Sequence, residues 1–130
     1  QRKPVIDPGQ SFGSVLRDND GLWRMWYITF QTRDPKKDLV GCATPQHLAY
    51  SRDGIHWKKP TLGLVKERGS KKNNIILGEH QKDKNGRCLT GYGGVSGMCI
   101  LDNTTHPHPK ARKRFTALYG GYRTASAEFC

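Results

Sequence analysis

The strongest constraint on the fold is a β-hairpin pattern that occurs twice along the chain. In the first copy, the strand-like runs 14–17 and 22–30 flank the turn sequence DNDG at 18–21. In the second copy, the runs 94–102 and 114–120 flank a longer polar insertion. Strand-prone runs joined by a polar connection are typical of antiparallel hairpins. The two copies therefore predict two pairs of antiparallel strands.

Matching residues relate the two hairpins to each other. Asp18 and Arg24 of the first copy recur as Asp102 and Arg114, 84 and 90 residues later. Apolar residues at helical spacing never persist for ten positions, and 15 Gly and 7 Pro interrupt the remaining runs. We therefore expect an all-β chain. Repetition of an antiparallel meander at this scale is typical of a β-propeller, whose blades are antiparallel sheets of about four strands.

The 130 residues have room for about two such blades. We predict a single partial propeller domain over 1–130, with a blade-like unit at 10–60, a connection at 61–90 and a second blade-like unit at 91–130. The connection contains one short strand-like run, 74–77. Because neighbouring blades bury each other's faces around a ring, two blades cannot close the ring by themselves.

The composition is strongly basic. A total of 22 Lys and Arg against 11 Asp and Glu gives a net charge of +11, which admits polyanions such as nucleic acid or acidic glycans as partners. The basic residues occur mainly as dispersed pairs, and only the segment KARKR at 110–114 is dense. This spacing favours a solvated basic surface. We do not expect nucleic acid as a partner, and polyanion binding is the least favoured hypothesis.

The sequence carries no signature of a membrane span, a metal centre or a cofactor. No apolar run approaches the roughly 18–20 residues of a membrane-spanning helix. The four cysteines contain no C-x-x-C pair, a spacing that excludes the usual zinc sites and favours buried free thiols. The HPHP segment at 106–109 has no nearby Cys or acid to complete a metal site. We expect no metal and no cofactor, and the oligomeric state is left open.

One segment carries a family resemblance. The sequence YSRDGIHWKKP at 50–60, followed by LGLV at 62–65 and GSKKNNII at 69–76, resembles five-bladed β-propeller proteins related to glycoside hydrolase families 32, 43 and 68. The second strand of each hairpin is similar to the same group. The resemblance implies a ring of five blades with a sugar pocket on its axis, a carbohydrate ligand, and an extracellular or periplasmic location.

The centre of this segment is a tight turn at Asp53 and Gly54. An Asp side chain can accept hydrogen bonds from backbone amides two residues on, and Gly adopts the left-handed conformation. Trp57 can then anchor the outgoing strand by burying its large ring. We therefore interpret Asp53, Gly54 and Trp57 as structural turn residues, and His56 as a residue at the rim.

Glycoside hydrolysis requires a pair of carboxylates, one protonated as the acid and one ionised as the nucleophile or base. The resemblance implies that such acids project into the axial pocket. Asp7, which precedes the first hairpin strand, is our candidate catalytic residue; the alternative is an Asp-Pro-Gly turn that opens the chain. Asp18, Asp20 and Asp102 occupy hairpin turns, and we do not expect them to be catalytic.

Two hypotheses for the function follow from the sequence. In the first, the chain is part of a carbohydrate-active propeller that binds or hydrolyses glycosides through axial carboxylates. The parent protein would then be a glycoside hydrolase if further blades supply the missing acids, and we expect the 130 residues alone to be inactive. In the second, the chain belongs to a non-catalytic propeller that binds a glycan or a protein partner.

Overall fold

The computed structural model of the chain is built from β-strands. It describes residue 6 and residues 10–29, 45–67, 69–78, 95–105 and 112–121. Within these ranges every regular element is a strand and every strand pairing is antiparallel, so the predicted all-β class is confirmed. The elements are β1 (Gln10–Arg17), β2 (Trp23–Thr29), β3 (Gln46–Ser51), β4 (Trp57–Lys58), β5 (Ile75–Leu77), β6 (Val95–Asp102) and β7 (Phe115–Gly121).

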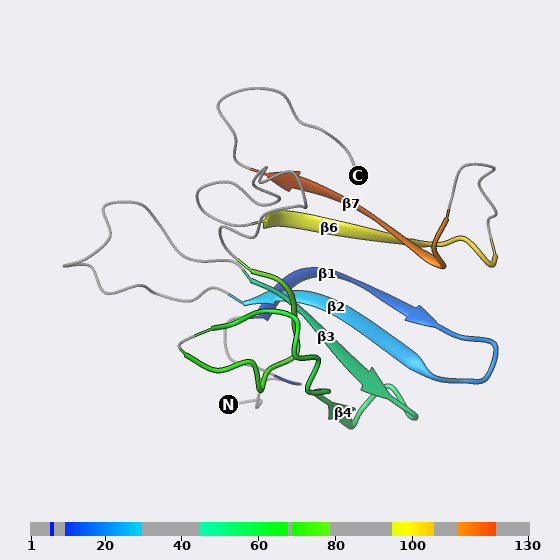
Figure 1. Ribbon diagram of the computed structural model, residues 1–130. Coiled ribbons are helices and arrows are strands. Elements are labelled where there is room, and N and C mark those ends of the chain that lie inside the picture. The colour runs from blue at the N-terminus through cyan, green and yellow to red at the C-terminus, as the bar shows by residue number, and fades with distance from the viewer. Residues whose placement is uncertain are drawn as a thin grey trace.

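The first sheet is an antiparallel meander that runs β1-β2-β3-β4 in chain order (Figure 1). β4 pairs with β3 at Tyr50 and Ser51, and β5 pairs with β3 at Gln46 and His47. Because β2 occupies the other edge of β3, β4 and β5 lie on the same side of it, one after the other. The four-strand path is the arrangement expected of one propeller blade.

β5 lies within 61–90, the stretch that the sequence assigned to a connection. Ile75 of β5 is only 2% exposed, and the preceding Asn74 is also buried. The Asn74 side-chain amide donates to the carbonyl oxygen of Leu48 at 2.8 Å and to the hydroxyl of Tyr27 at 3.1 Å. This stretch therefore contributes a strand and a buried polar anchor to the first sheet.

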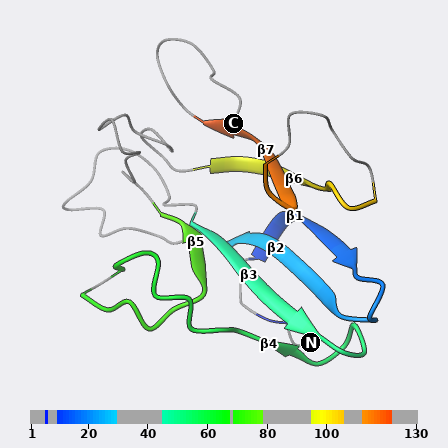
Figure 2. The same ribbon diagram turned by 45° about the vertical axis from the view of Figure 1, so that its right-hand side comes forward.

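The second sheet is the hairpin β6–β7. Its inner strand β6 lies beside β1 in both views (Figures 1 and 2). The Ser14 hydroxyl accepts a hydrogen bond from the Ile100 N–H at 3.0 Å and donates to the Met98 carbonyl at 3.1 Å. One side chain of the first sheet therefore bonds directly to the backbone of the second. β1 and β6 also each have one register shift near the start of the strand.

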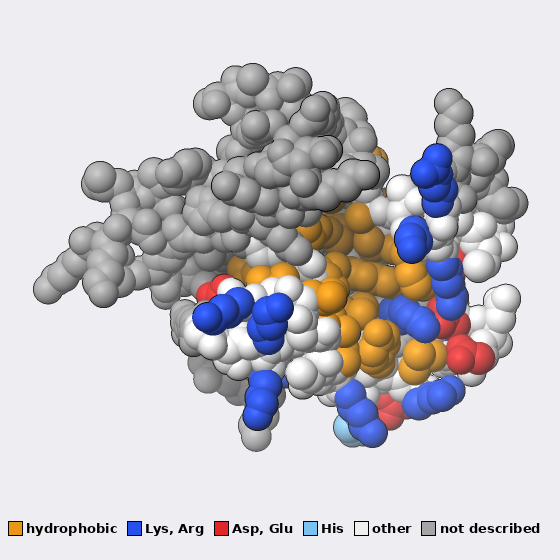
Figure 3. Space-filling model, in the orientation of Figure 1, with side chains coloured by type: hydrophobic (Ala, Val, Ile, Leu, Met, Phe, Trp, Pro, Cys, Tyr) orange, Lys and Arg blue, Asp and Glu red, His pale blue; other side chains and the backbone are white. Residues whose placement is uncertain are grey.

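The main apolar core lies between the two sheets. Trp26 and Leu48 from the first sheet meet Met98 and Ile100 from the second. Phe115 presents its ring to Trp26 in an edge-on arrangement, with the ring centroids 5.1 Å apart. On the side of the molecule that Figure 3 shows, apolar side chains gather near the centre, with Lys and Arg toward the lower and right margins. Face-to-face burial of this kind is expected of neighbouring blades.

The opposite face of the first sheet has its own apolar cluster. Met25 and Tyr27 alternate with Trp26 along β2, so their side chains point to the other side of the sheet. They pack with Ala49, and Trp57 of β4 packs against the same cluster. β2 is therefore buried on both faces, and the short strand β4 is tied to the core through its tryptophan.

Cys99 is exposed, in contrast to the predicted burial of the thiols. Its neighbours Met98 and Ile100 point into the core, and the alternation of side chains along β6 places Cys99 on the other face. The remaining cysteines, Cys42, Cys88 and Cys130, lie outside the described residues.

Candidate functional site

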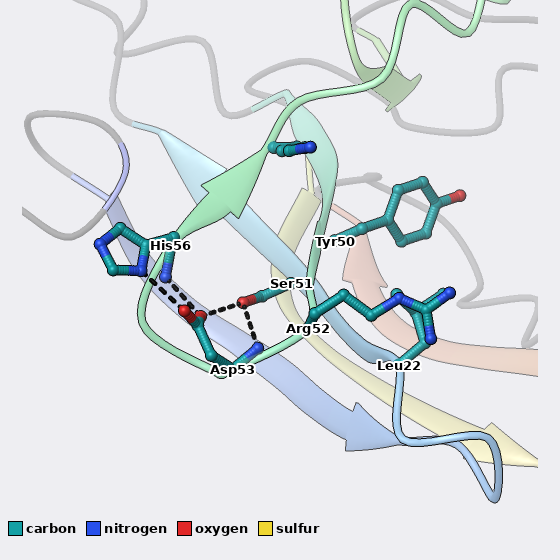
Figure 4. Close-up of a pocket in the computed structure, with 7 residues that line it drawn as sticks. Leu22, Tyr50, Ser51, Arg52, Asp53 and His56 are labelled. Atoms are coloured by element: carbon teal, nitrogen blue, oxygen red, sulfur yellow. Dashed lines mark hydrogen bonds and ion pairs between the residues drawn. The ribbon is translucent and has the colours of Figure 1, made fainter.

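A tightly hydrogen-bonded turn joins β3 to β4 (Figure 4). The Asp53 Oδ1 atom accepts hydrogen bonds from the backbone N–H of Ile55 at 2.8 Å and of His56 at 2.7 Å. The Ser51 hydroxyl donates to the same oxygen at 2.9 Å and accepts from the N–H of Gly54 at 2.9 Å. One carboxylate and one hydroxyl therefore accept hydrogen bonds from the backbone N–H groups of the turn from Asp53 to His56.

Gly54 and Trp57 fix the shape of the same turn. Gly54 has a φ of 75°, in the left-handed region that favours glycine. The Trp57 indole N–H donates to the Gly54 carbonyl oxygen at 3.1 Å. The structure thus places Asp53, Gly54 and Trp57 in one turn, which is held to the sheet by the tryptophan ring.

Both oxygens of the Asp53 carboxylate are hydrogen-bonded within this turn. Its Oδ2 atom lies 2.7 Å from Nδ1 of the His56 imidazole. This hydrogen bond, together with those from the backbone N–H groups of His56 and Ile55, holds the pKa of Asp53 well below its usual range. Asp53 is therefore ionised at neutral pH and has no proton to give as a general acid.

A pocket of about 300 Å³ lies beside the turn. Tyr50 of β3 and Lys58 of β4 are direct cross-strand partners, so their side chains share one face of the sheet at the pocket. Figure 4 shows Tyr50 and Arg52 on one side of the turn and His56 on the other. The residues that line the pocket are Leu22, Tyr50, Ser51, Arg52, Asp53, His56 and Lys58.

Arg52 and Lys58 bring positive charge to this pocket. Both residues are exposed, and neither side chain makes a hydrogen bond or an ion pair with the part of the chain that the structure describes. Guanidinium and ammonium groups carry several hydrogen-bond donors each. These donors are consequently free to bind a ligand that enters the pocket.

A second polar cluster, which we call the seam cluster, joins the two sheets through Asp18, Arg24, Asp102 and Arg114. Asp18 forms an ion pair with Arg24 of its own sheet, and its other oxygen accepts from Arg114 of the second sheet at 2.7 Å. Arg114 also binds Asp102 at 2.9 Å. The side chains of Asp18 and Asp102 are only 5% and 12% exposed. The two copies of the repeat are therefore linked by shared ion pairs.

Aromatic rings connect the seam cluster to the pocket. The Arg24 guanidinium lies 5.5 Å from the ring centroid of Tyr50 and 5.5 Å from that of Phe115. The Arg114 guanidinium lies 4.7 Å from the same Phe115 ring. Cation–π contacts of this length are attractive. Tyr50 therefore connects the seam cluster to the pocket. Its ring contacts the Arg24 guanidinium and also lines the pocket.

The seam cluster predicts a specific acid sensitivity. The hydrogen bond from Arg114 is the main reason that the pKa of Asp102 lies well below its usual range. Because the pKa is lower in the folded state than the roughly 3.9 of an unfolded Asp, the stability it contributes is complete above about pH 4 and is lost as the pH falls below that value. Asp102→Asn should therefore lower the free energy of unfolding at neutral pH and reduce its decline in acid. Urea denaturation between about pH 7 and pH 2 measures both effects, and parallel pH profiles for the two proteins would refute the assignment.

The structure describes Asp18 and Asp102 but not Asp7. Asp7 lies outside the described residues, so its catalytic role stays a prediction. Asp18 and Asp102 do lie at the ends of hairpin strands, but they are bound to arginines, a role that the sequence reasoning missed. The signal was present in the repeat itself, because Arg24 and Arg114 recur together with the two acids.

The described ranges contain no metal-binding cluster and no membrane-spanning helix. In those ranges, no group of three or more His, Cys, Asp or Glu side chains could hold a metal ion. The same ranges contain no helix with the length and apolar character needed to cross a membrane. The histidines at 106 and 108 lie outside them.

Comparisons with known proteins provide no relative for this chain. No family model matches it, and no curated protein and no solved structure does so either. The resemblance to propellers of the glycoside hydrolase families therefore stays a prediction from the sequence.

Proposed function

We propose that this chain is part of a carbohydrate-active β-propeller and that the pocket beside the β3–β4 turn binds a sugar. The observation that carries the proposal is the lining of the pocket, where the ring of Tyr50 lies with Arg52 and Lys58, whose donors have no partner among the described residues. The volume of about 300 Å³ is at the lower end of the range usual for ligand pockets. This size suits a single sugar ring.

The chemistry of a sugar matches these side chains. A sugar ring has C–H groups on its faces and hydroxyl groups around its edge. The Tyr50 ring offers an apolar surface for the C–H groups, and the donors of Arg52 and Lys58 can bind hydroxyl oxygens. The hydrogen-bonded turn holds the backbone between these side chains in one shape, which reduces the cost of ordering the site on binding.

The surroundings of Asp53, Asp18 and Asp102 favour binding over hydrolysis. A glycoside hydrolase needs one carboxyl group that is protonated near neutral pH. The pKa values of Asp53 and Asp102 are lowered, so both carboxyl groups are ionised near neutral pH. The two oxygens of Asp18 form ion pairs with Arg24 and Arg114. Hydrolysis by the parent protein would therefore depend on acids other than these three, and Asp7 is our candidate for one of them.

The proposal is tested by removing Arg52 and Lys58, the two cations of the pocket lining. The double variant Arg52→Ala/Lys58→Ala is expected to bind its sugar about tenfold or more weakly, because hydrogen bonds from charged donors are lost. Isothermal titration calorimetry of the intact chain with a panel of monosaccharides measures the loss. Lys66→Ala/Lys71→Ala is the matched control, since it removes the same charge from exposed positions outside the pocket lining. Equal weakening by both double variants would count against the pocket.

A further inference from the structure

We infer that the sugar bound in this pocket carries an anionic group, a carboxylate or a sulfate. This inference rests on the proposed function and adds the class of ligand. It starts from a contrast between two pairs of cations. Arg24 and Arg114 are neutralised by Asp18 and Asp102 in the seam cluster, whereas the positive charges at the pocket have no such partners within the described residues.

The charge of the pocket lining is positive. Arg52 and Lys58 contribute +2 and Asp53 contributes −1, so the lining carries +1 with His56 neutral. The Asp53 oxygens do not compete for the two cations. Its Oδ1 atom already accepts from two backbone N–H groups and the Ser51 hydroxyl, and its Oδ2 atom is hydrogen-bonded to His56. Among the described residues, Asp53 therefore leaves the donors of Arg52 and of Lys58 to a ligand anion.

The types of the two cations suit an anionic group. A guanidinium presents parallel N–H donors that match the paired oxygens of a carboxylate or a sulfate, and an ammonium adds a point charge. A neutral sugar would displace water from Arg52 and Lys58 without supplying a compensating charge. An anionic sugar supplies that charge while its ring remains beside Tyr50, the aromatic member of the lining.

The experiment compares sugars that differ only in charge. Glucose is paired with glucuronate, and N-acetylglucosamine with its 6-sulfate, in calorimetric titrations of the intact chain. We expect the anionic member of each pair to bind about tenfold or more tightly at low salt. The difference should shrink as the ionic strength rises, because these exposed cations are screened.

Charge-neutralising variants locate the preference in the pocket. Arg52→Gln/Lys58→Gln keeps hydrogen-bonding groups but removes both charges, and it should abolish the preference for the anionic sugar. Lys66→Gln/Lys71→Gln makes the same change in net charge outside the pocket lining and should keep the preference. Circular dichroism of each variant confirms that it is folded. An anionic preference lost equally in both double variants would overturn the inference and indicate attraction by the overall charge of the protein.

The remaining outcomes separate the inference from the proposed function. Equal binding of neutral and anionic sugars in the pocket overturns the inference and leaves sugar binding intact. Inorganic sulfate that binds as tightly as the sulfated sugar, with no binding of neutral sugars, supports the anion site and overturns the proposed function. Failure of every sugar and of sulfate to bind overturns both.

Discussion

Trp26→Ala is expected to lower the free energy of unfolding by about 3–5 kcal/mol, the usual cost of deleting a buried aromatic side chain. Trp26 is 5% exposed and packs with residues from both sheets. Its removal takes away apolar contacts with Leu48, Met98 and Phe115 at once. The cavity that remains would lie at the junction of the sheets, where closure would require one sheet to move against the other. Chemical denaturation of the intact chain measures the loss.

Ile55→Ala is the control for this experiment. Ile55 is 69% exposed in the β3–β4 turn, so its truncation should change the free energy of unfolding by about 0.5 kcal/mol or less. A loss at Trp26 no larger than the loss at Ile55 would mean that the two sheets do not share a core.

Asp18→Ala is expected to have the next largest effect, a loss of about 3 kcal/mol in the free energy of unfolding. Asp18 is the shared acid of the seam cluster, bonded to Arg24 of its own sheet and Arg114 of the other. The Arg24 side chain is only 17% exposed, so the substitution would leave a largely buried cation without its carboxylate. The cost arises chiefly from that uncompensated charge.

Asp20→Ala is the matched control on the same hairpin. The Asp20 carboxylate accepts one exposed hydrogen bond from the Leu22 N–H, at 3.1 Å. Its loss should cost about 1 kcal/mol or less, within the usual range for one hydrogen bond. If chemical denaturation gives Asp18→Ala and Asp20→Ala the same stability, the seam cluster does not contribute to joining the sheets.

The local parts of this fold could be predicted from the sequence. The strand-like runs on either side of 18–21 do form β1–β2, and the runs 94–102 and 114–120 do form β6–β7, because hairpin formation depends largely on neighbouring residues. The conformation of the turn at Asp53 and Gly54 likewise depends on residues two or three positions apart. In such cases the sequence contains both partners of each interaction within one short window.

The long-range parts could not be predicted in this way. The run 74–77 predicts a short strand, but the pairing of this strand, β5, with β3 depends on tertiary placement. Asp18 and Arg114 are 96 positions apart, and only the packing of the two sheets brings them together. The residues of the pocket were missed for a related reason. Arg52 and Lys58 are visible in the sequence, but only the three-dimensional structure shows that no described acid is paired with them.

The pocket and the junction of the sheets share one residue, Tyr50, and this has a consequence for function. Its ring is held by Arg24, which is itself fixed by Asp18. Loss of the seam cluster would therefore be expected to loosen the aromatic side of the pocket as well as the contact between the sheets. The position of the pocket on β3 and β4, beside this junction, would link the proposed sugar binding to the packing of the two sheets.

The most direct test of sugar binding at this pocket is a titration of the intact chain followed by the NMR shifts of its backbone amides. Glucuronate and N-acetylglucosamine 6-sulfate are the ligands to add. We expect the largest shifts at Tyr50, Arg52 and Lys58, which line the pocket, with small shifts at the control positions Lys66 and Lys71. Saturating shifts that are largest away from the pocket, or no saturable shifts at all, would contradict the assignment of this pocket as a carbohydrate site.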